Sequence, residues 1–107
     1  MQQIGARALQ QWLQDADRAS PLLLDVREPW EYEYCHIVNA RLVPMHSVPG
    51  KLDTLDQHAQ IVVICHHGMR SMQVARFLEH AGFDRIYNLQ GGVDSWAQLV
   101  DTSMPTY

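Results

Sequence analysis

The chain has 107 residues and a mass of 12.3 kDa, which corresponds to one domain. Its hydrophobic share of 47% and charged share of 19% exclude a disordered chain. Because the net charge is −4 and Lys51 is the only lysine, we expect neither a nucleic-acid-binding nor an anionic-membrane-binding surface. No apolar run is long enough to cross a membrane, no secretory signal is visible, and two Cys are too few for a disulfide scaffold. We therefore expect a cytoplasmic protein.

Helices and strands are predicted to alternate along the chain. In order, we expect a helix over 5–18, a strand over 22–26, a short helix over 28–34, a strand over 40–43, a short helix over 47–55, a strand over 61–64, a helix over 71–81, a strand over 86–89 and a helix over 93–100. Gly82 stands where a glycine often ends a helix. The polar tail after residue 100 is expected to be loosely held. The alternation predicts an α/β fold with a parallel sheet covered on both faces.

The segment from Ile64 to Ser71, with the sequence ICHHGMRS, carries the strongest chemical signal. A buried strand is predicted to end at Cys65, a loop containing Gly68 follows, and a helix begins near Ser71. Ligands of such sheets bind beyond the carboxyl ends of the strands, where a helix N-terminus offers unpaired N–H groups and a partial positive charge. These groups favour the thiolate form of Cys65, and Arg70 can bind an oxyanion through two hydrogen bonds. The pattern predicts a nucleophilic thiolate in an anion-binding loop, against the simpler role of a small apolar residue at a strand end.

Four segments together resemble the motifs of one family. They are residues 23–32 (LLDVREPWEY), His36-Ile37 with Ala40, residues 65–71 (CHHGMRS), and residues 87–92 (YNLQGG) with Trp96. The sequence resembles a single-domain member of the rhodanese family of sulfurtransferases over about residues 5–100, and we treat residues 1–107 as one domain. The resemblance implies a parallel five-stranded sheet with helices on both faces.

The resemblance also implies a two-step sulfur transfer. Cys65 would take a sulfane sulfur from a donor such as thiosulfate and hold it as a persulfide, until a thiophilic acceptor, cyanide or a thiol, removes it. Arg70 would help to bind an anionic donor, while Asp25 and Arg27 would brace the loop by charge pairing. The substrate-binding residues would be those of the loop after Cys65: His66, His67, Gly68, Met69, Arg70 and Ser71. No cofactor is implied, and a sulfur-relay protein is a further candidate partner.

The sequence departs from the family pattern in two places. Cys35 stands where the family usually has Gly, and Val38-Asn39 replaces a common Pro-Gly pair at a turn, where Asn39 can adopt the left-handed conformation. Cys35 could attack a persulfide on Cys65 as a second thiol, but the role of a bystander is favoured.

Three other functions are weighed against sulfur transfer. A rhodanese-like interaction or regulatory module with negligible turnover is the main alternative, although inactive relatives commonly lose the Cys that this chain keeps at 65. Phosphatases and arsenate reductases on this fold have five residues between Cys and Arg, whereas this chain has four between Cys65 and Arg70. We expect no metal site, because adjacent Cys and His residues on a strand face opposite ways. Glu31 and Glu33 are expected on a solvated face rather than as an acid–base pair.

Overall fold

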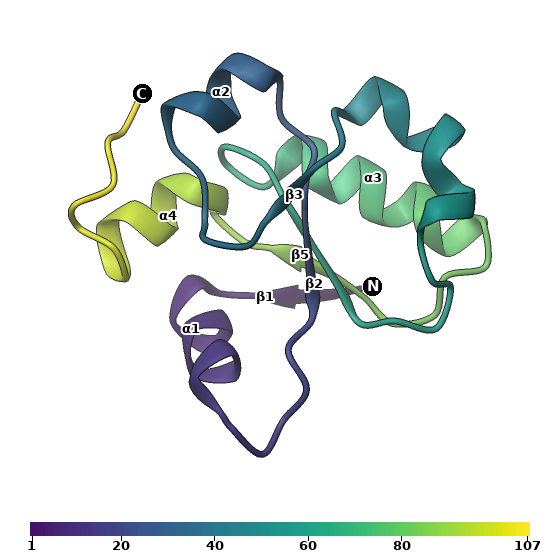
Figure 1. The fold of residues 1–107 in the computed structure, drawn as a ribbon, viewed down its shortest axis with the longest axis horizontal. Coiled ribbons are helices and arrows are strands. Elements are labelled where there is room, and N and C mark those ends of the chain that lie inside the picture. Colours follow the sequence, from purple (N-terminus) through teal and green to yellow (C-terminus); the bar gives the residue numbers. More distant parts are fainter.

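The centre of the molecule is a parallel five-stranded sheet with the strand order β1-β5-β4-β2-β3 (Figure 1). The computed structural model describes residues 1–107. The strands are β1 (Gln2–Ile4), β2 (Leu22–Asp25), β3 (Arg41–Leu42), β4 (Ile61–Ile64) and β5 (Ile86–Leu89). The helices are α1 (Ala6–Gln14), α2 (Pro29–Tyr34), α3 (Met69–His80) and α4 (Gly92–Leu99), with the 3-10 helix η1 (Met45–Thr54) before β4. The predicted α/β fold is confirmed.

Two apolar cores lie on opposite faces of this sheet. In β4, Ile61 and Val63 belong to the core formed with α3 and η1, and Val62 and Ile64 belong to the core formed with α1 and α4. All four side chains are fully buried. A strand that is covered on both faces needs apolar residues at every position, which explains the uninterrupted IVVI run.

Several element boundaries differ from those predicted. α1 ends at Gln14 rather than near 18, and α3 begins at Met69, two residues before Ser71. The region predicted as a helix over 47–55 is the 3-10 helix η1, which contains Pro49. β1 was not predicted, because it has only three residues and gains its partner from β5 at the far end of the chain. With β1 the sheet has the five strands that the family resemblance implied.

Two predictions about local backbone are confirmed. Gly82 has φ +100° and ends α3, where its N–H donates to the carbonyl of Glu79 and the N–H of Phe83 donates to that of Leu78. Asn39 adopts the left-handed conformation with φ +71°. Asn39 thus makes the turn that a Pro-Gly pair commonly makes in the family.

The tail does not match its prediction. Beyond α4, the chain turns at Asp101, whose carbonyl accepts from the N–H of Met104, and then runs back to end beside α2 (Figure 1). There the ring of Tyr107 packs edge-on against Trp30 and Tyr34. The expectation of a loosely held tail was wrong, because an aromatic side chain at its end finds a site on the folded domain. No helix of the structure has the length and apolar character needed to cross a membrane.

Candidate active site

Two central strands bring the predicted site residues to one edge of the sheet. β2 and β4 are parallel neighbours, with Asp25 in register with Ile64. From β2 the chain continues to β3 on one side, and from β4 it continues to β5 on the other. Ligand sites of open parallel sheets lie at such a reversal of strand order, beyond the carboxyl ends of the strands. Cys65 follows β4 directly at this point.

Cys65 lies under the loop that leads into α3. Cys65 is 1% exposed, and its Sγ accepts a hydrogen bond of 3.1 Å from the N–H of Gly68. Gly68 has φ +100°, a conformation that favours glycine, and it immediately precedes α3. Because the first N–H groups of a helix have no partner within the helix, the Sγ lies at a natural site for negative charge.

A buried polar network also supports Cys65. Its Sγ lies 3.3 Å from the hydroxyl of Ser71, which in turn donates to Oδ1 of Asn88. The amide of Asn88 donates to the carbonyl of Gly68 at 3.2 Å and to the side chain of Gln3 at 2.9 Å. The network therefore connects the thiol and its loop to the edge strand β1.

The start of α4 anchors the carbonyls of the same loop. Val93 donates its N–H to the carbonyl of Cys65 at 2.9 Å, and Asp94 donates its N–H to the carbonyl of His66 at 3.1 Å. A Cβ at Gly92 would lie 2.3 Å from the Cys65 carbonyl oxygen, so the backbones meet too closely for any other residue. The motif containing Gly91-Gly92 thus holds the loop in place.

Arg70 forms an ion pair that the sequence did not reveal. Its two terminal nitrogens donate to the two carboxylate oxygens of Glu31 at 2.7 and 2.9 Å. Glu31 is 4% exposed, and the hydrogen bonds from Arg70 lower its pKa to about 2. The expectation that Glu31 lies on a solvated face was wrong. The capping-box spacing, with Glu31 three residues after Glu28, was the available signal that this side chain turns back toward the chain.

Asp25 and Arg27 pair with each other rather than with the loop. Both are fully buried, and Arg27 donates to the carboxylate of Asp25 with a shortest distance of 2.7 Å. Burial is the largest single influence on the pKa of Arg27 and lowers it, but the hydrogen bonds and charges of Asp25 and Tyr107 together outweigh burial and raise the pKa of the guanidinium. Arg27 also donates to the carbonyl of Cys35 at 2.7 Å and to the hydroxyl of Tyr107 at 2.9 Å. The pair of Asp25 and Arg27 was predicted to brace the Cys65 loop, but Arg27 instead holds the end of α2, through Cys35, and the tail, through Tyr107.

The second cysteine lies against the same arginine. Cys35 is buried, its Sγ is 4.0 Å from a terminal nitrogen of Arg27, and both cysteines of the chain are free thiols.

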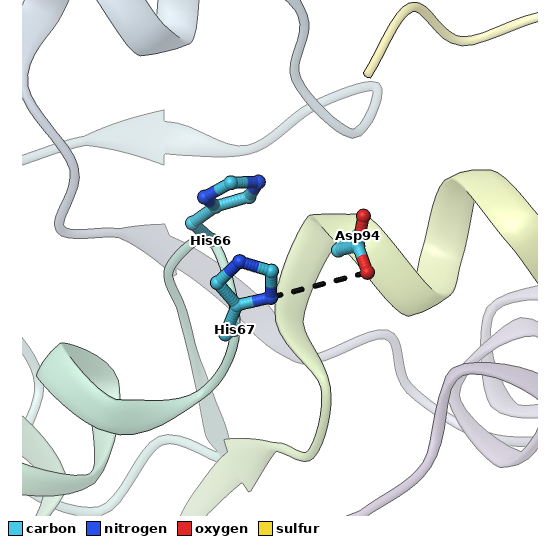
Figure 2. A group of neighbouring side chains, drawn as sticks. All are labelled: His66, His67 and Asp94. Carbon is cyan, nitrogen blue, oxygen red and sulfur yellow. Dashed lines mark ion pairs between the residues drawn. The ribbon is translucent and has the colours of Figure 1, made fainter. Parts of the chain in front are cut away.

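His66 and His67 lie at the mouth of the loop, beside Asp94 in the first turn of α4 (Figure 2). The centroids of their rings are 3.9 Å apart. Adjacent residues of a strand point in opposite directions, but these two residues lie in a loop and their side chains lie together. The potential ligand atoms of His66, His67 and Asp94 lie within 4.8 Å of one another, close enough together to hold a metal ion. Burial, followed by the charge of His67, lowers the pKa of His66.

Tyr107 completes the site, and no local sequence pattern pointed to it. Its ring stacks on His66 with centroids 3.9 Å apart and planes 10° apart. Its hydroxyl accepts from Arg27 and donates to Oε1 of Glu31 at 2.8 Å. Burial raises the pKa of Tyr107 to about 12, so the hydroxyl keeps its proton at neutral pH.

Comparisons with known proteins agree with this fold. The family model described as a rhodanese-like domain matches residues 6–99. A sulfurtransferase of Allochromatium vinosum is 34% identical over 96 residues, which cover 90% of this chain and 88% of the relative. The thiosulfate sulfurtransferase GlpE of Actinobacillus pleuropneumoniae is 39% identical over 74 residues, 69% of this chain and 68% of that protein. A rhodanese-like domain protein from Staphylococcus aureus superposes with a TM-score of 0.85 at 28% identity, covering 100% of this chain and 99% of that one. The chain therefore belongs to the family of rhodanese-like domains.

Proposed function

We propose that this protein is a sulfurtransferase that carries sulfur on Cys65 as a persulfide. The observation that supports it most directly is the buried Sγ of Cys65, which accepts the N–H of Gly68 at the start of α3. A persulfide is anionic, and this position offers it backbone donors and the positive end of a helix. The names of the relatives, sulfurtransferase and thiosulfate sulfurtransferase, support the same class of chemistry.

In the first step, the thiolate of Cys65 attacks the outer sulfur of thiosulfate. A new S–S bond forms to Cys65, the S–S bond of thiosulfate breaks, and sulfite leaves with its electron pair. The backbone N–H groups of residues 66–71 hold the transferred sulfur. Arg70 uses two of its five N–H donors for Glu31, which leaves three for the anionic part of the donor.

In the second step, the acceptor attacks the outer sulfur of the persulfide. The S–S bond breaks, and Cys65 leaves as a thiolate. Cyanide becomes thiocyanate, and a thiolate becomes a new persulfide. Because an anion enters and an anion leaves in each step, His66 and His67 need not act as general bases.

One observation favours the alternative function of an interaction module without turnover. Cys65 is almost fully buried, and the cavities of the structure do not include it among their lining residues. In such a module the loop would serve as a binding surface, and loss of the thiol would leave binding intact.

Intact mass spectrometry after exposure to thiosulfate separates these functions. The reduced wild-type protein and a Cys35→Ser variant should each gain one sulfur atom, which cyanide removes as thiocyanate, while Cys65→Ser should gain none. The Cys35→Ser variant is the matched control, because it removes the other buried thiol. If the wild type gains no sulfur from thiosulfate or from glutathione persulfide, sulfur transfer is ruled out and the interaction module is favoured.

A further inference from the structure

The end of the tail after α4 is fastened to the domain by the side chain of Tyr107, whereas Met104, nearer α4, packs against an apolar core. Residues 102, 103, 105 and 106 are exposed. The backbone of this stretch receives one hydrogen bond from α2, from the hydroxyl of Tyr34 to the carbonyl of Thr106, at 3.3 Å. Tyr107 itself is 36% exposed, yet its hydroxyl makes two hydrogen bonds, one with Arg27 and one with Glu31. Release of this one side chain would therefore free the end of the tail.

The site that holds the Tyr107 side chain, which we call its seat, consists of an aromatic side (His66, Trp30 and Tyr34) and a polar side (Arg27 and Glu31). On the aromatic side, His66 stacks on the ring at 3.9 Å, and the rings of Trp30 and Tyr34 meet it edge-on at 5.5 and 5.8 Å. The two edge-on contacts have the geometry and distances that favour aromatic pairs. The ring thus joins α2 to the loop that follows Cys65.

On the polar side, the hydroxyl of Tyr107 shares an oxygen with the active-site arginine. Oε1 of Glu31 accepts from Tyr107 at 2.8 Å and from Arg70 at 2.9 Å. The hydroxyl also accepts from Arg27, so its donor and acceptor capacities are both used. Tyr107 therefore fastens both flanks of the loop, His66 directly and Arg70 through Glu31.

Because Cys65 is 1% exposed, a bulky acceptor can reach it only if a covering group moves. The loop backbone is held by hydrogen bonds from Val93 and Asp94 at the start of α4. Tyr107, in contrast, is held by one stacked ring, two edge contacts and two hydrogen bonds of its side chain. The side chain of Tyr107 can therefore move away from the loop without breaking a backbone hydrogen bond of any helix or strand.

We propose that Tyr107 is a gate that selects the sulfur acceptor. When it is seated, the loop admits a small linear anion such as cyanide, and the seat must empty before the cysteine of a peptide or protein reaches the persulfide on Cys65. The acceptor step is the one described above: the incoming thiolate bonds to the outer sulfur, and Cys65 leaves as a thiolate. This inference rests on the proposed function, and it adds that the acceptor class is set by a residue outside the Cys65 loop.

Single-turnover transfer from sulfur-loaded protein to two acceptors tests the gate. The rates to cyanide and to glutathione are measured for the wild type, Tyr107→Phe, Tyr107→Ala and the control Phe77→Ala, which removes a half-exposed ring on α3. Because the hydroxyl bonds two charged groups, its loss should raise the glutathione-to-cyanide rate ratio about tenfold in Tyr107→Phe, and Tyr107→Ala should raise it further. Phe77→Ala should leave the ratio unchanged. A ratio within about twofold of the wild type in both Tyr107 variants would overturn the gate.

Alkylation of Cys65 provides a second measurement that does not depend on sulfur transfer. In the Cys35→Ser background, labelling by iodoacetamide is compared with labelling by the bulkier fluorescein maleimide. Tyr107→Phe should raise the maleimide-to-iodoacetamide rate ratio, and an unchanged ratio counts against the gate even if Tyr107→Ala does not fold. If the wild type cannot be loaded with sulfur, the proposed function fails, while the labelling result still decides whether Tyr107 covers Cys65.

Discussion

The guanidinium group of Arg70 and the carboxylate of Glu31 form two hydrogen bonds, of 2.7 and 2.9 Å, across 39 positions of the sequence. The pair joins the first turn of α3 to α2 and offsets the positive charge beside Cys65. A donor anion that reaches this loop meets an arginine already bound to a carboxylate. The local charge balance is therefore set by Glu31 as much as by Arg70.

Acid should weaken the fold through Glu31. Its pKa is lowered to about 2 in the folded protein, from an ordinary 4.5, with the Arg70 hydrogen bonds as the largest cause. A lowered pKa stabilises the fold fully above about pH 4.5, and this contribution, about 3 kcal/mol, is lost as the pH falls toward 2. Urea unfolding of the wild type and Glu31→Gln should give free energies that converge between pH 7 and pH 3. Glu33→Gln, an exposed control on the same helix, should show no such convergence, and parallel curves for Glu31→Gln would contradict the prediction.

Removal of the Ser71 hydroxyl should destabilise the protein. In Ser71→Ala, the buried Oδ1 of Asn88 loses its donor, and an unsatisfied buried group of this kind costs about 1–3 kcal/mol. Chemical denaturation should show this loss, whereas Ser103→Ala in the exposed tail should change stability by less than about 0.5 kcal/mol. Equal effects at the two positions would mean that the buried network does not contribute to stability.

A methyl group at position 92 should displace the Cys65 loop. The Cβ of Gly92→Ala would lie 2.3 Å from the Cys65 carbonyl oxygen, and Gly92 has φ +59°. Strain and overpacking together should cost about 2–5 kcal/mol, with loss of sulfur loading. Gly50→Ala is the matched control, since its Cβ meets nothing within 4 Å and should change stability by less than about 1 kcal/mol. Thermal unfolding and intact mass measure the two effects, and sulfur loading as in the wild type would show that the loop tolerates the methyl group.

The titration of His66 should report whether Tyr107 is seated. Burial is the largest cause of the lowered pKa of His66, and the Tyr107 ring covers one face of the imidazole at 3.9 Å. In Tyr107→Ala this pKa should rise toward its ordinary value of 6.5, as followed by NMR of the imidazole. In Phe77→Ala the titration of His66 should match that of the wild type. An identical titration in Tyr107→Ala would mean that the ring does not shield His66.

The sequence predicted the parts of the site that are local in the chain. An apolar run ending in Cys65 and a glycine before a helix are neighbours in sequence, so their pattern indicates both the strand β4 and the loop. Contacts with distant partners leave no such pattern: Tyr107 bonds Glu31 across 76 positions, and Gln3 bonds Asn88 across 85. β1 escaped prediction for the same reason, since its three residues are a strand because they pair with β5.

The hydrogen bond between Gln3 and Asn88 links the first strand of the sheet to the Cys65 loop. Gln3 supports Asn88, which supports the hydroxyl beside Cys65, while the last residue of the sequence contacts the opposite flank of the same loop. The Cys65 loop is therefore held on one flank by the edge strand β1 and on the other by Tyr107, so a substitution at Gln3 or at Tyr107 would reach it.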